Sequence, residues 1–527
     1  AEAMSVLPGS HMDNVKVYLT DYPYAGSRNK PGAREELLRQ LRRGALLLVF
    51  FGHGDAFDLA HESVLNITQV PDITNGHRSP FCYFGSCSVG RFEDTRYECI
   101  AEEMTRKPDG GAIAAVGATK ATTAGTNSVF ARNLLFPLFD SPDSTIGMAF
   151  FSAWPTDRIY HLFGDPTMTL RTPTPSVPGV AFSPDTLRPA VRFSAQTLTE
   201  VGSGEFVWTL FGPRRMRRYT SDRGTIDYAM PGLELGRGTG RIEHGRVYCR
   251  GTFPLGVPLD TVFVTNGFYA PIRRSCRLSI VASNDTVDIS LVRDTIRFAT
   301  EPAVVSDSSG PAVALSAAGR PLEEGCTVPP VFELTGLLSD PSGVLIADLP
   351  GVKPRLELRG SGIEYDLRDM LSFEDSSGTR ARFKLGVELE RTADTVEVEA
   401  FDNMQNRTQV SVVVCRTDAG DALALDSVCI YPNPVVRDGW VTFLSNKTAA
   451  ARVRIFSLSG RLVRDLGALP VLFGYNQLYW DGRDSDGGLP GNGIYICDVL
   501  LQSTPGQAHA AGATETVRAK ERFAVLR

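Results

Sequence analysis

Two short runs of apolar residues constrain this chain more than any other feature. The runs are ALLLVFF at 45–51 and PFCYFGS at 80–86, and both are nearly uninterrupted and of strand length. A strand with one solvated face alternates apolar and polar residues, whereas a parallel strand covered by helices on both faces does not. The two runs therefore predict central strands of an α/β sheet.

The sequence around these runs alternates strand-like and helical stretches. Residues 32–43 predict an amphipathic helix with leucines at 37, 38 and 41, which ends at Gly44. Further strands are expected at 15–19 and 112–118, and further helices at about 97–106, 127–139 and 144–154. This alternation predicts an α/β domain with a mainly parallel sheet over residues 1–172.

The chain after the prolines at 173, 175 and 178 is predicted to be all β. Short alternating runs such as EFVWTLF and RLSIVA are separated by Gly, Pro, Asp and Asn, which is typical of antiparallel sandwiches. A chain of 527 residues is also too long for a single core. We expect three β-sandwich (Ig-like) domains, at 179–304, 309–416 and 425–527.

The composition excludes several classes of protein. No apolar run approaches the ~18 residues of a membrane span, so no transmembrane segment is expected. A net charge of −6 gives no general attraction to nucleic acid, and the arginines at 214, 215, 217 and 218 are expected to lie on a solvated hairpin. The nine cysteines include no C-x-x-C pair, which argues against a zinc site.

A histidine and a cysteine directly follow the two central strands. His53 lies between Gly52 and Gly54 after the first strand, and Cys87 follows the second. Because the carboxyl ends of parallel strands converge at one edge of a sheet, the two residues are expected to share a site. An imidazole that takes and returns a proton, beside a thiolate that attacks a peptide carbonyl, forms a catalytic dyad. The N–H groups of Gly54 and Cys87 are the candidates for an oxyanion hole.

A purely structural interpretation stands beside the catalytic one. In it, Cys87 is a small buried hydrophobe and His53 is a residue of a turn. Four further residues are interpreted as bystanders: Cys82 and Cys99 in the core, and His61 and His77 in loops.

Four segments, in order along the chain, resemble the gingipain family: VFFGHGD (49–55), FGSCSVGRFED (84–94), GGAIAAVGAT (110–119) and YHLFGDPTMTLR (160–171). The resemblance implies a caspase-type α/β fold in which His53, followed by Gly54, is the base and Cys87 is the nucleophile. It also implies that Gly164-Asp165-Pro166 is a structural turn, with Asp165 capping backbone amides. The remaining acidic residues near the base are expected to be solvated loop carboxylates rather than a third catalytic member: Asp55, Asp58 and Glu62.

The β half carries a second resemblance. The LSDPSGV and AFDNMQN turns of 309–416 are similar to the region after the catalytic domain in PorU-like sortases of the type IX secretion system. YPNPVVRDGWVTF and YWDGRDSDGGLPGNGIYICDVL resemble the type IX C-terminal sorting domain and the related Ig-like module of hook-capping proteins. These likenesses imply a secreted or outer-membrane, cell-surface location reached through the periplasm. They also imply a protein or peptide substrate and the outer-membrane secretion machinery as partners.

The gingipain resemblance also indicates what this sequence lacks. The family's sheet has strands ahead of the one expected at 15–19, and these would supply walls of the substrate pocket. The first residues lack a signal-peptide profile, so an upstream segment is expected. No cofactor is expected to be required. The resemblance allows structural calcium, although no loop in the sequence offers a convincing set of ligands.

Two functions from different classes are consistent with these observations. The leading hypothesis is a cysteine endopeptidase that acts through a thioacyl-enzyme, and a sortase-like transpeptidase would pass that acyl group to an amine. The alternative is a catalytically inactive secreted surface or adhesin protein whose β-sandwich modules bind glycans or proteins. His53 and Cys87 distinguish the two hypotheses, because only the first needs their side chains to meet across one groove.

Overall fold

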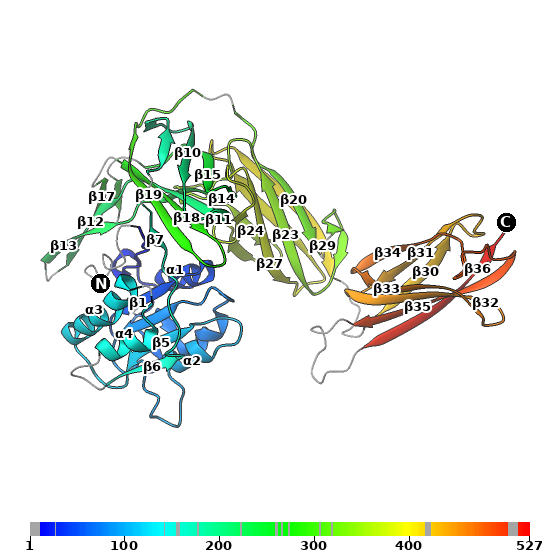
Figure 1. Cartoon of the computed structure of the whole chain (residues 1–527), viewed down its shortest axis with the longest axis horizontal. Coiled ribbons are helices and arrows are strands. Elements are labelled where there is room, and N and C mark those ends of the chain that lie inside the picture. Colours follow the sequence, from blue (N-terminus) through cyan, green and yellow to red (C-terminus); the bar gives the residue numbers. More distant parts are fainter. Residues whose placement is uncertain are drawn as a thin grey trace.

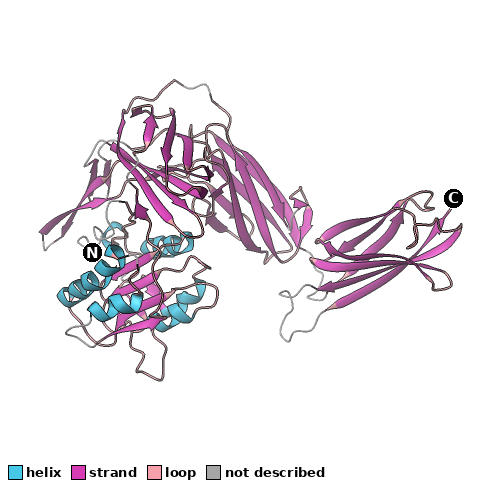
Figure 2. Ribbon diagram, in the orientation of Figure 1, coloured by secondary structure: helices cyan, strands magenta, loops and turns pink. Residues whose placement is uncertain are grey.

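The chain is multidomain, with an N-terminal α/β region followed by regions that consist mostly of β-sheet (Figures 1 and 2). In Figure 1 the α/β region is blue to cyan, and the β regions run from green to red. A computed structural model describes residues 11–26, 28–141, 143–153, 159–176, 179–221, 224–258, 262–264, 267–271, 275–304, 307–317, 320–416, 423–503 and 515–527.

The α/β region contains a four-stranded sheet in the order β1-β4-β5-β6. Its strands are β1 (Leu47–Phe51), β4 (Phe81–Gly85), β5 (Ala114–Ala118) and β6 (Tyr160–Gly164). The first three strands run parallel, as the apolar runs predict, but β6 is antiparallel, so the sheet is mixed. The helices and short elements are η2 (Leu19–Asp21), α1 (Pro31–Arg43), β2 (Asp58–Leu59), β3 (Leu65–Asn66), η3 (Ile67–Asp72), α2 (Ile100–Arg106), α3 (Ala124–Asp140) and α4 (Ile146–Ala153).

Both faces of this sheet are covered, which explains why its strands are apolar throughout. Along β4, Cys82 and Phe84 belong to a core shared with α1 and α2. Phe81 and Tyr83 belong to a second core, shared with α3 and α4. Every residue of β4 is buried. This arrangement is the one that parallel strands between two layers of helices require.

The strand expected at 15–19 is absent. Residues 13–18 have no regular secondary structure, and η2 begins at Leu19. The chain is extended at Tyr18, but it contacts the β region instead of a neighbouring strand. The Lys16 ammonium donates to the Ala229 carbonyl at 3.0 Å, and the Tyr18 and Tyr228 rings meet edge to face at 4.8 Å. Lys16 and Tyr18 of this segment therefore contact the β region rather than a neighbouring strand of the α/β sheet.

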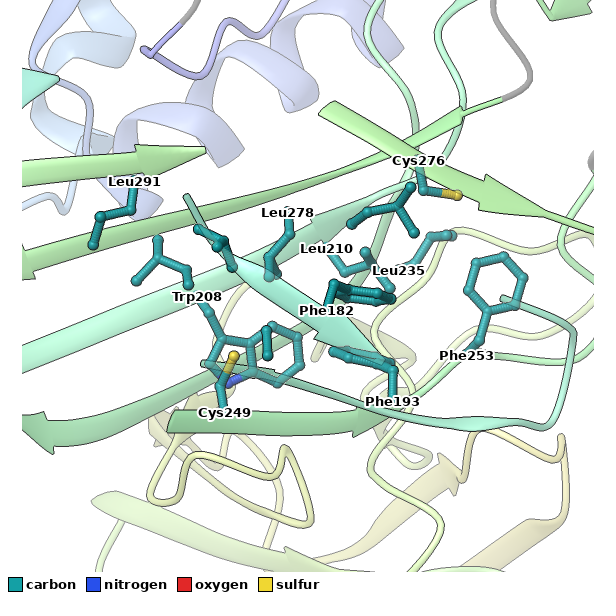
Figure 3. Packing of buried hydrophobic residues seen from close by; sticks show 14 of the residues in the cluster. Phe182, Phe193, Trp208, Leu210, Leu235, Cys249, Phe253, Cys276, Leu278 and Leu291 are labelled. Carbon is teal, nitrogen blue, oxygen red and sulfur yellow. The ribbon is translucent and has the colours of Figure 1, made fainter. Parts of the chain in front are cut away.

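The first β region (residues 174–304) is built on a nine-stranded sheet, in which β9 pairs only with β19. Its strands are β7 (Thr174–Pro175), β8 (Ala181–Ser183), β9 (Thr186–Leu187), β10 (Arg192–Leu198), β11 (Ser203–Phe211), β14 (Glu234–Glu243), β15 (Arg246–Thr252), β18 (Ser275–Ser283) and β19 (Asp288–Phe298). A second sheet contains β12 (Arg215–Ser221), β13 (Gly224–Met230), β16 (Val262–Val264) and β17 (Gly267–Pro271). Figure 3 shows aromatic residues at the centre of the core, where Phe193 meets Trp208 edge to face at 5.6 Å.

The arginine run lies on the β12–β13 hairpin, as expected, but it is not wholly solvated. Arg218 is exposed and pairs with Asp227 at 2.7 Å. Arg217, in contrast, is 7% exposed and pairs with Asp21 of η2 at 2.9 Å. A buried charge needs a paired partner, and here that partner comes from the other region of the fold.

The second β region (residues 307–416) contains two five-stranded sheets. One contains β20 (Ala312–Ala317), β21 (Arg320–Pro321), β23 (Val331–Ser339), β26 (Ser372–Phe373) and β27 (Arg380–Glu388). The other contains β22 (Cys326–Val328), β24 (Arg355–Leu358), β25 (Ile363–Asp366), β28 (Ala393–Phe401) and β29 (Arg407–Arg416). Their facing side chains form one hydrophobic core.

Packing crosses from the second β region into the first. Leu345, Leu349 and Phe401 are buried in the core of the first region. The Trp208 indole N–H also donates to the Ser376 carbonyl at 3.1 Å. The domain boundaries drawn from the sequence stay predictions, and the one near 304–309 is bridged by this shared packing.

The C-terminal β region (residues 423–527) packs a three-stranded sheet against a four-stranded sheet around its own core. The strands are β30 (Leu425–Tyr431), β31 (Gly439–Ser445), β34 (Gly474–Trp480), β33 (Leu462–Val471), β32 (Ala449–Ser457), β35 (Gly493–Ser503) and β36 (Thr516–Val525). Figure 1 shows this region as a separate body at the right. Among the described residues, no helix is both long and apolar enough to cross a membrane.

Candidate active site

His53 and Cys87 occupy equivalent positions past two paired strands. The parallel strands β1 and β4 are in register up to the pair Phe51 and Gly85. His53 lies two residues beyond Phe51, and Cys87 lies two residues beyond Gly85. Both residues therefore leave the carboxyl edge of the sheet, where loops of an α/β fold build their sites. Their roles as base and nucleophile stay predictions.

The loops that carry the two residues touch each other. The Gly52 N–H donates to the Gly85 carbonyl at 3.4 Å. A Cβ on Gly54 would lie 2.7 Å from the Ser86 hydroxyl oxygen and 2.8 Å from the Asp58 carbonyl oxygen, so only glycine fits at this position without displacing its neighbours. Ser86 is fully buried, and its hydroxyl has no hydrogen-bond partner among the described residues.

The sulfur of Cys87 is held by the segment that leads into α3. The Thr122 N–H donates to the Cys87 Sγ at 3.4 Å, and the thiol donates to the Thr122 carbonyl at 3.5 Å. Thr123 caps α3, since its hydroxyl accepts from the Thr126 N–H at 3.2 Å. A helix N-terminus carries partial positive charge, so negative charge on this sulfur would lie in a favourable field. Cys87 itself is only half-buried.

A buried polar network fixes Thr122. The Thr122 hydroxyl donates to the Asn127 side-chain oxygen at 3.1 Å, and the Tyr160 hydroxyl donates to the same atom at 2.6 Å. Tyr83 donates to the Asn127 carbonyl at 2.8 Å, which ties the network to β4. Thr122 was not among the residues expected at this site. The only signal for it was the TKATTAGTN stretch, which contains the capping threonine of a helix.

The His53 loop folds back on itself and brings a second imidazole with it. The Ala60 N–H donates to the His53 carbonyl at 2.8 Å, and Gly54 pairs with Leu59 in an isolated bridge. As a result, the rings of His53 and His61 stack with centroids 4.5 Å apart. His61 lies in a loop, as expected, but its ring contacts the predicted base, and its interpretation as a bystander stays a prediction. His53 remains exposed.

The three loop carboxylates near His53 are engaged elsewhere. Asp55 accepts from the N–H groups of Phe57 and Asp58, Asp58 accepts from Asn66 at 2.9 Å, and Glu62 accepts from the Tyr24 hydroxyl at 3.1 Å. Within the described residues no carboxylate pairs with His53. Asp55 and Glu62 lie in loops, as expected, whereas Asp58 begins the short strand β2. That none of the three is a third catalytic member stays a prediction.

The proposed oxyanion donors are not used by the fold. The N–H groups of Gly54 and Cys87 make no hydrogen bond to any described residue. Backbone N–H groups without a protein partner at a strand edge are suited to bind a developing negative charge. Asp165, in contrast, accepts from the Thr167 N–H at 2.8 Å, which confirms its structural capping role.

The neighbouring cysteines and histidine have environments unlike those of the predicted dyad. Burial raises the pKa of the Cys82 thiol, and burial also raises the pKa of the Cys99 thiol to about 12. His161, on β6, packs against Phe92 of the loop after Cys87 at 4.8 Å. Burial lowers the pKa of His161, although the charge of Glu93 opposes this effect. Both cysteines are buried in the core, as expected.

One group of acidic residues among those described could hold a metal ion, and it lies outside the α/β region. Carboxylate oxygens of Asp307, Asp340 and Asp402 lie within 4.8 Å of one another. The first precedes β20, the second follows β23 and the third follows β28. These three residues are widely separated along the chain, so no local sequence motif joins them.

Comparisons with curated proteins and with solved structures gave different results. Among curated proteins, none matches. Two solved structures are similar: dimeric latent PorU from Porphyromonas gingivalis, with 16% identity over 80% of this chain and 41% of that chain, and the Arg-specific cysteine proteinase gingipain R (RGPB), with 15% identity over 50% and 56%. Their TM-scores are 0.30 and 0.25. The chain thus spans less than two thirds of either structure.

A family model matches the N-terminal part of the chain. Residues 2–171 match the model of peptidase family C25, and this range contains β1, β4, His53 and Cys87. The α/β region of this chain is thus similar to peptidase family C25, the gingipain family.

Proposed function

We propose that this chain carries the reactive centre of a cysteine peptidase, with Cys87 as nucleophile and His53 as general acid and base. The observation that carries the proposal is the matched placement of the two residues, each two positions past a strand of one hydrogen-bonded parallel pair. The match of residues 2–171 to the C25 family model supports the same reaction class.

The proposed reaction uses groups of this chain at each step. His53 takes the proton from the Cys87 thiol, and the sulfur attacks the carbonyl carbon of a peptide bond. The N–H groups of Gly54 and Cys87 stabilise the oxyanion of the tetrahedral intermediate. His53 then returns the proton to the leaving amine, and a thioester remains on Cys87. The Thr122 N–H, 3.4 Å from the sulfur, keeps Sγ in position throughout.

The acceptor of the acyl group decides between hydrolysis and transfer. Water that attacks the thioester gives an endopeptidase, and an amine gives a sortase-like transpeptidase. We propose that the substrate is a protein or peptide exported by a type IX secretion route, and that this chain acts at the cell surface or outer membrane in contact with that machinery. Support comes from the sequence likeness of 425–527 to type IX sorting domains, and from the compact two-sheet body into which this segment folds.

A thiol-directed acyl probe tests the assignment of the nucleophile. The unmodified chain is expected to be labelled, and Cys87→Ala is expected to lose the label while its circular dichroism spectrum is unchanged. Cys429→Ala is the matched control, because Cys429 is the exposed cysteine of the described residues and lies in the C-terminal region. Labelling that persists in Cys87→Ala would contradict the proposal.

The inactive surface-protein hypothesis gives a different outcome. His53 is exposed and no described carboxylate orients it, which is what a degenerate site would also show. If the unmodified chain takes up no acyl probe at any pH between about 5 and 9, where a dyad of histidine and cysteine should react, that hypothesis is favoured.

A further inference from the structure

The β14–β15 hairpin is closed only at its turn. The two strands are in register at a single pair, Glu243 and Arg246, which flanks the turn residues His244 and Gly245. Both turn residues have positive φ, 52° and 70°, as in the tight two-residue turns that join the strands of a paired hairpin. The separation of the strands beyond this pair therefore has a cause outside the hairpin.

A turn of the second β region enters the gap between the strands. This segment is residues 374–379, here called the inserted turn. The Thr239 N–H of β14 donates to the Asp375 carbonyl at 2.9 Å. The Arg250 N–H of β15 and the Trp208 indole N–H both donate to the Ser376 carbonyl, at 3.0 and 3.1 Å. Hydrogen bonds from both strands thus fix the inserted turn and hold the hairpin open.

A cavity of about 620 Å³ lies between the inserted turn and the hairpin turn. Volumes of this order are typical of sites that bind a ligand. Ser376 of the inserted turn lines the cavity, and Phe206, from the hydrophobic core, contributes an aromatic ring. The other side chains of the lining make the cavity mainly polar: Arg241, Glu243, His244, Arg246 and Tyr248.

Two arginines give the cavity an excess of positive charge. Arg241 and Arg246 are exposed on the outer face of the sheet, whereas their neighbours Ile242 and Val247 point inward and are buried. Within the part of the chain that the structure describes, neither guanidinium forms a salt bridge or a hydrogen bond. Glu243 is the one acidic residue of the lining, so two arginines face one carboxylate. Unbalanced positive charge in a concave site attracts an anion.

The open strands also present backbone groups to the cavity. Along a strand, the N–H and C=O groups of alternate residues point to the same side. Those of Thr239 and Arg250 face the gap, since they bond to the inserted turn, so those of Arg241 and Tyr248, two residues nearer the hairpin turn, face it as well. Strand groups outside a ladder pair with an extended peptide backbone. An acidic polysaccharide would meet the same arginines but has no regular row of N–H and C=O groups, so the strands favour a peptide.

We propose that this cavity binds an acidic segment of a protein partner in an extended conformation. Arg241 and Arg246 pair with a carboxylate side chain of the segment, because a guanidinium matches a carboxylate with two parallel hydrogen bonds. The Ser376 hydroxyl makes no hydrogen bond to a described residue, so it is free to donate to the same carboxylate. The backbone groups of Arg241 and Tyr248 bind the main chain of the segment.

Fluorescence polarisation of the full chain with a labelled peptide of alternating glutamate and valine tests the proposal. This peptide is expected to bind, and the same peptide with glutamine in place of glutamate is expected to bind at least about ten-fold more weakly, because it forms no charge-assisted hydrogen bonds. Arg241→Gln and Arg246→Gln are each expected to weaken binding of the glutamate peptide by at least about ten-fold. The affinity is also expected to fall as the salt concentration rises.

Arg188→Gln is the matched control, because Arg188 is an exposed arginine of the same region that does not line the cavity. It is expected to leave the affinity unchanged. Cys87→Ala is also expected to bind the peptide as the unmodified chain does, so the result is independent of the proposed reaction. The proposal is overturned if the glutamine peptide binds as tightly as the glutamate peptide, or if neither cavity arginine variant weakens binding. It is also overturned if the glutamate peptide does not bind, whether or not the acidic polysaccharide hyaluronate does.

Discussion

The α/β region and the C-terminal β region differ in where a cysteine lies relative to a strand. In the α/β region, Cys87 lies just past the end of a strand, half-buried, beside N–H groups that the fold leaves unused. In the C-terminal region, Cys497 lies inside β35 and Asp498 follows it, both fully buried within a paired ladder. Strand ends leave reactive groups accessible to a substrate, whereas strand interiors commit them to packing. The difference in position, rather than in residue type, separates chemistry from structure.

The largest expected difference between these regions is in thiol reactivity. At pH 8 we expect iodoacetamide to modify Cys87 at least about 1000-fold faster than Cys497, because reaction follows thiolate fraction and access. Burial raises the pKa of Cys497 to about 12, with Asp498 and Glu521 adding to it, and the side chain is inaccessible. Peptide mass spectrometry of timed samples measures both rates. If Cys87 and Cys497 react at comparable rates in the folded chain, the position of a cysteine at the end or in the interior of a strand does not determine its reactivity.

A smaller effect is expected from crowding the loop that carries His53. In Gly54→Ala, the new methyl group would meet the Ser86 hydroxyl and the Asp58 carbonyl at 2.7 and 2.8 Å, so the loop must shift. A strain of about 1–3 kcal/mol is typical of such overpacking. We expect acyl-probe labelling of Cys87 to slow by about 10- to 100-fold, since a small displacement of a catalytic group is costly.

Gly491→Ala in the C-terminal region is the matched control for Gly54→Ala. No atom lies within 4 Å of the position that its Cβ would occupy. Labelling and the unfolding midpoint are expected to stay within error of the unmodified chain. If Gly54→Ala is also labelled at the original rate, the close approach of Gly54 to Ser86 does not control the reactivity of Cys87.

The smallest expected effect concerns ion pairs within the C-terminal region. Asp498 is fully buried and pairs with Arg518 at 2.5 Å and Arg454 at 3.1 Å. Asp465 pairs with Arg452 at 2.7 Å on the surface. Since the arginines of Asp498 are partly solvated, we expect Asp498→Asn to cost about 1–3 kcal/mol of unfolding free energy and Asp465→Asn less than about 1 kcal/mol. Urea titrations of both variants at pH 7 measure the difference.

The pH dependence gives an independent check on Asp498. Burial acts to raise its pKa, but hydrogen bonding and charge from Arg518 and Arg454 outweigh burial, so the folded-state pKa is lowered. A lowered folded-state pKa gives stability that is complete above the unfolded value of about 3.9 and is lost as the pH falls further. The penalty of Asp498→Asn should therefore shrink below about pH 4. A penalty that is constant from pH 7 to pH 3 would argue against a charge interaction.

The local sequence pattern was sufficient to predict most strands and helices of the α/β region. Most of the features that it did not predict depend on contacts between residues far apart in the sequence. The apolar runs at 45–51 and 80–86 became β1 and β4 because burial on both faces leaves no room for polar residues. The strand expected at 15–19 is absent, and Tyr18 of this segment packs against Tyr228, a contact that no local window contains. Thr122 and His61 reach the site through loop folding, which periodicity does not encode.

The shared packing of the first and second β regions has a consequence for how this chain can be divided. Leu345, Leu349 and Phe401 complete the hydrophobic centre around Trp208, although a proline- and serine-containing stretch near 304–309 reads as a natural place to cut. A fragment that ended there would expose to water the hydrophobic surface that these three side chains cover. We expect such a fragment to self-associate. Residues 174–416 therefore form one folding unit, which should be kept whole when the chain is divided for expression.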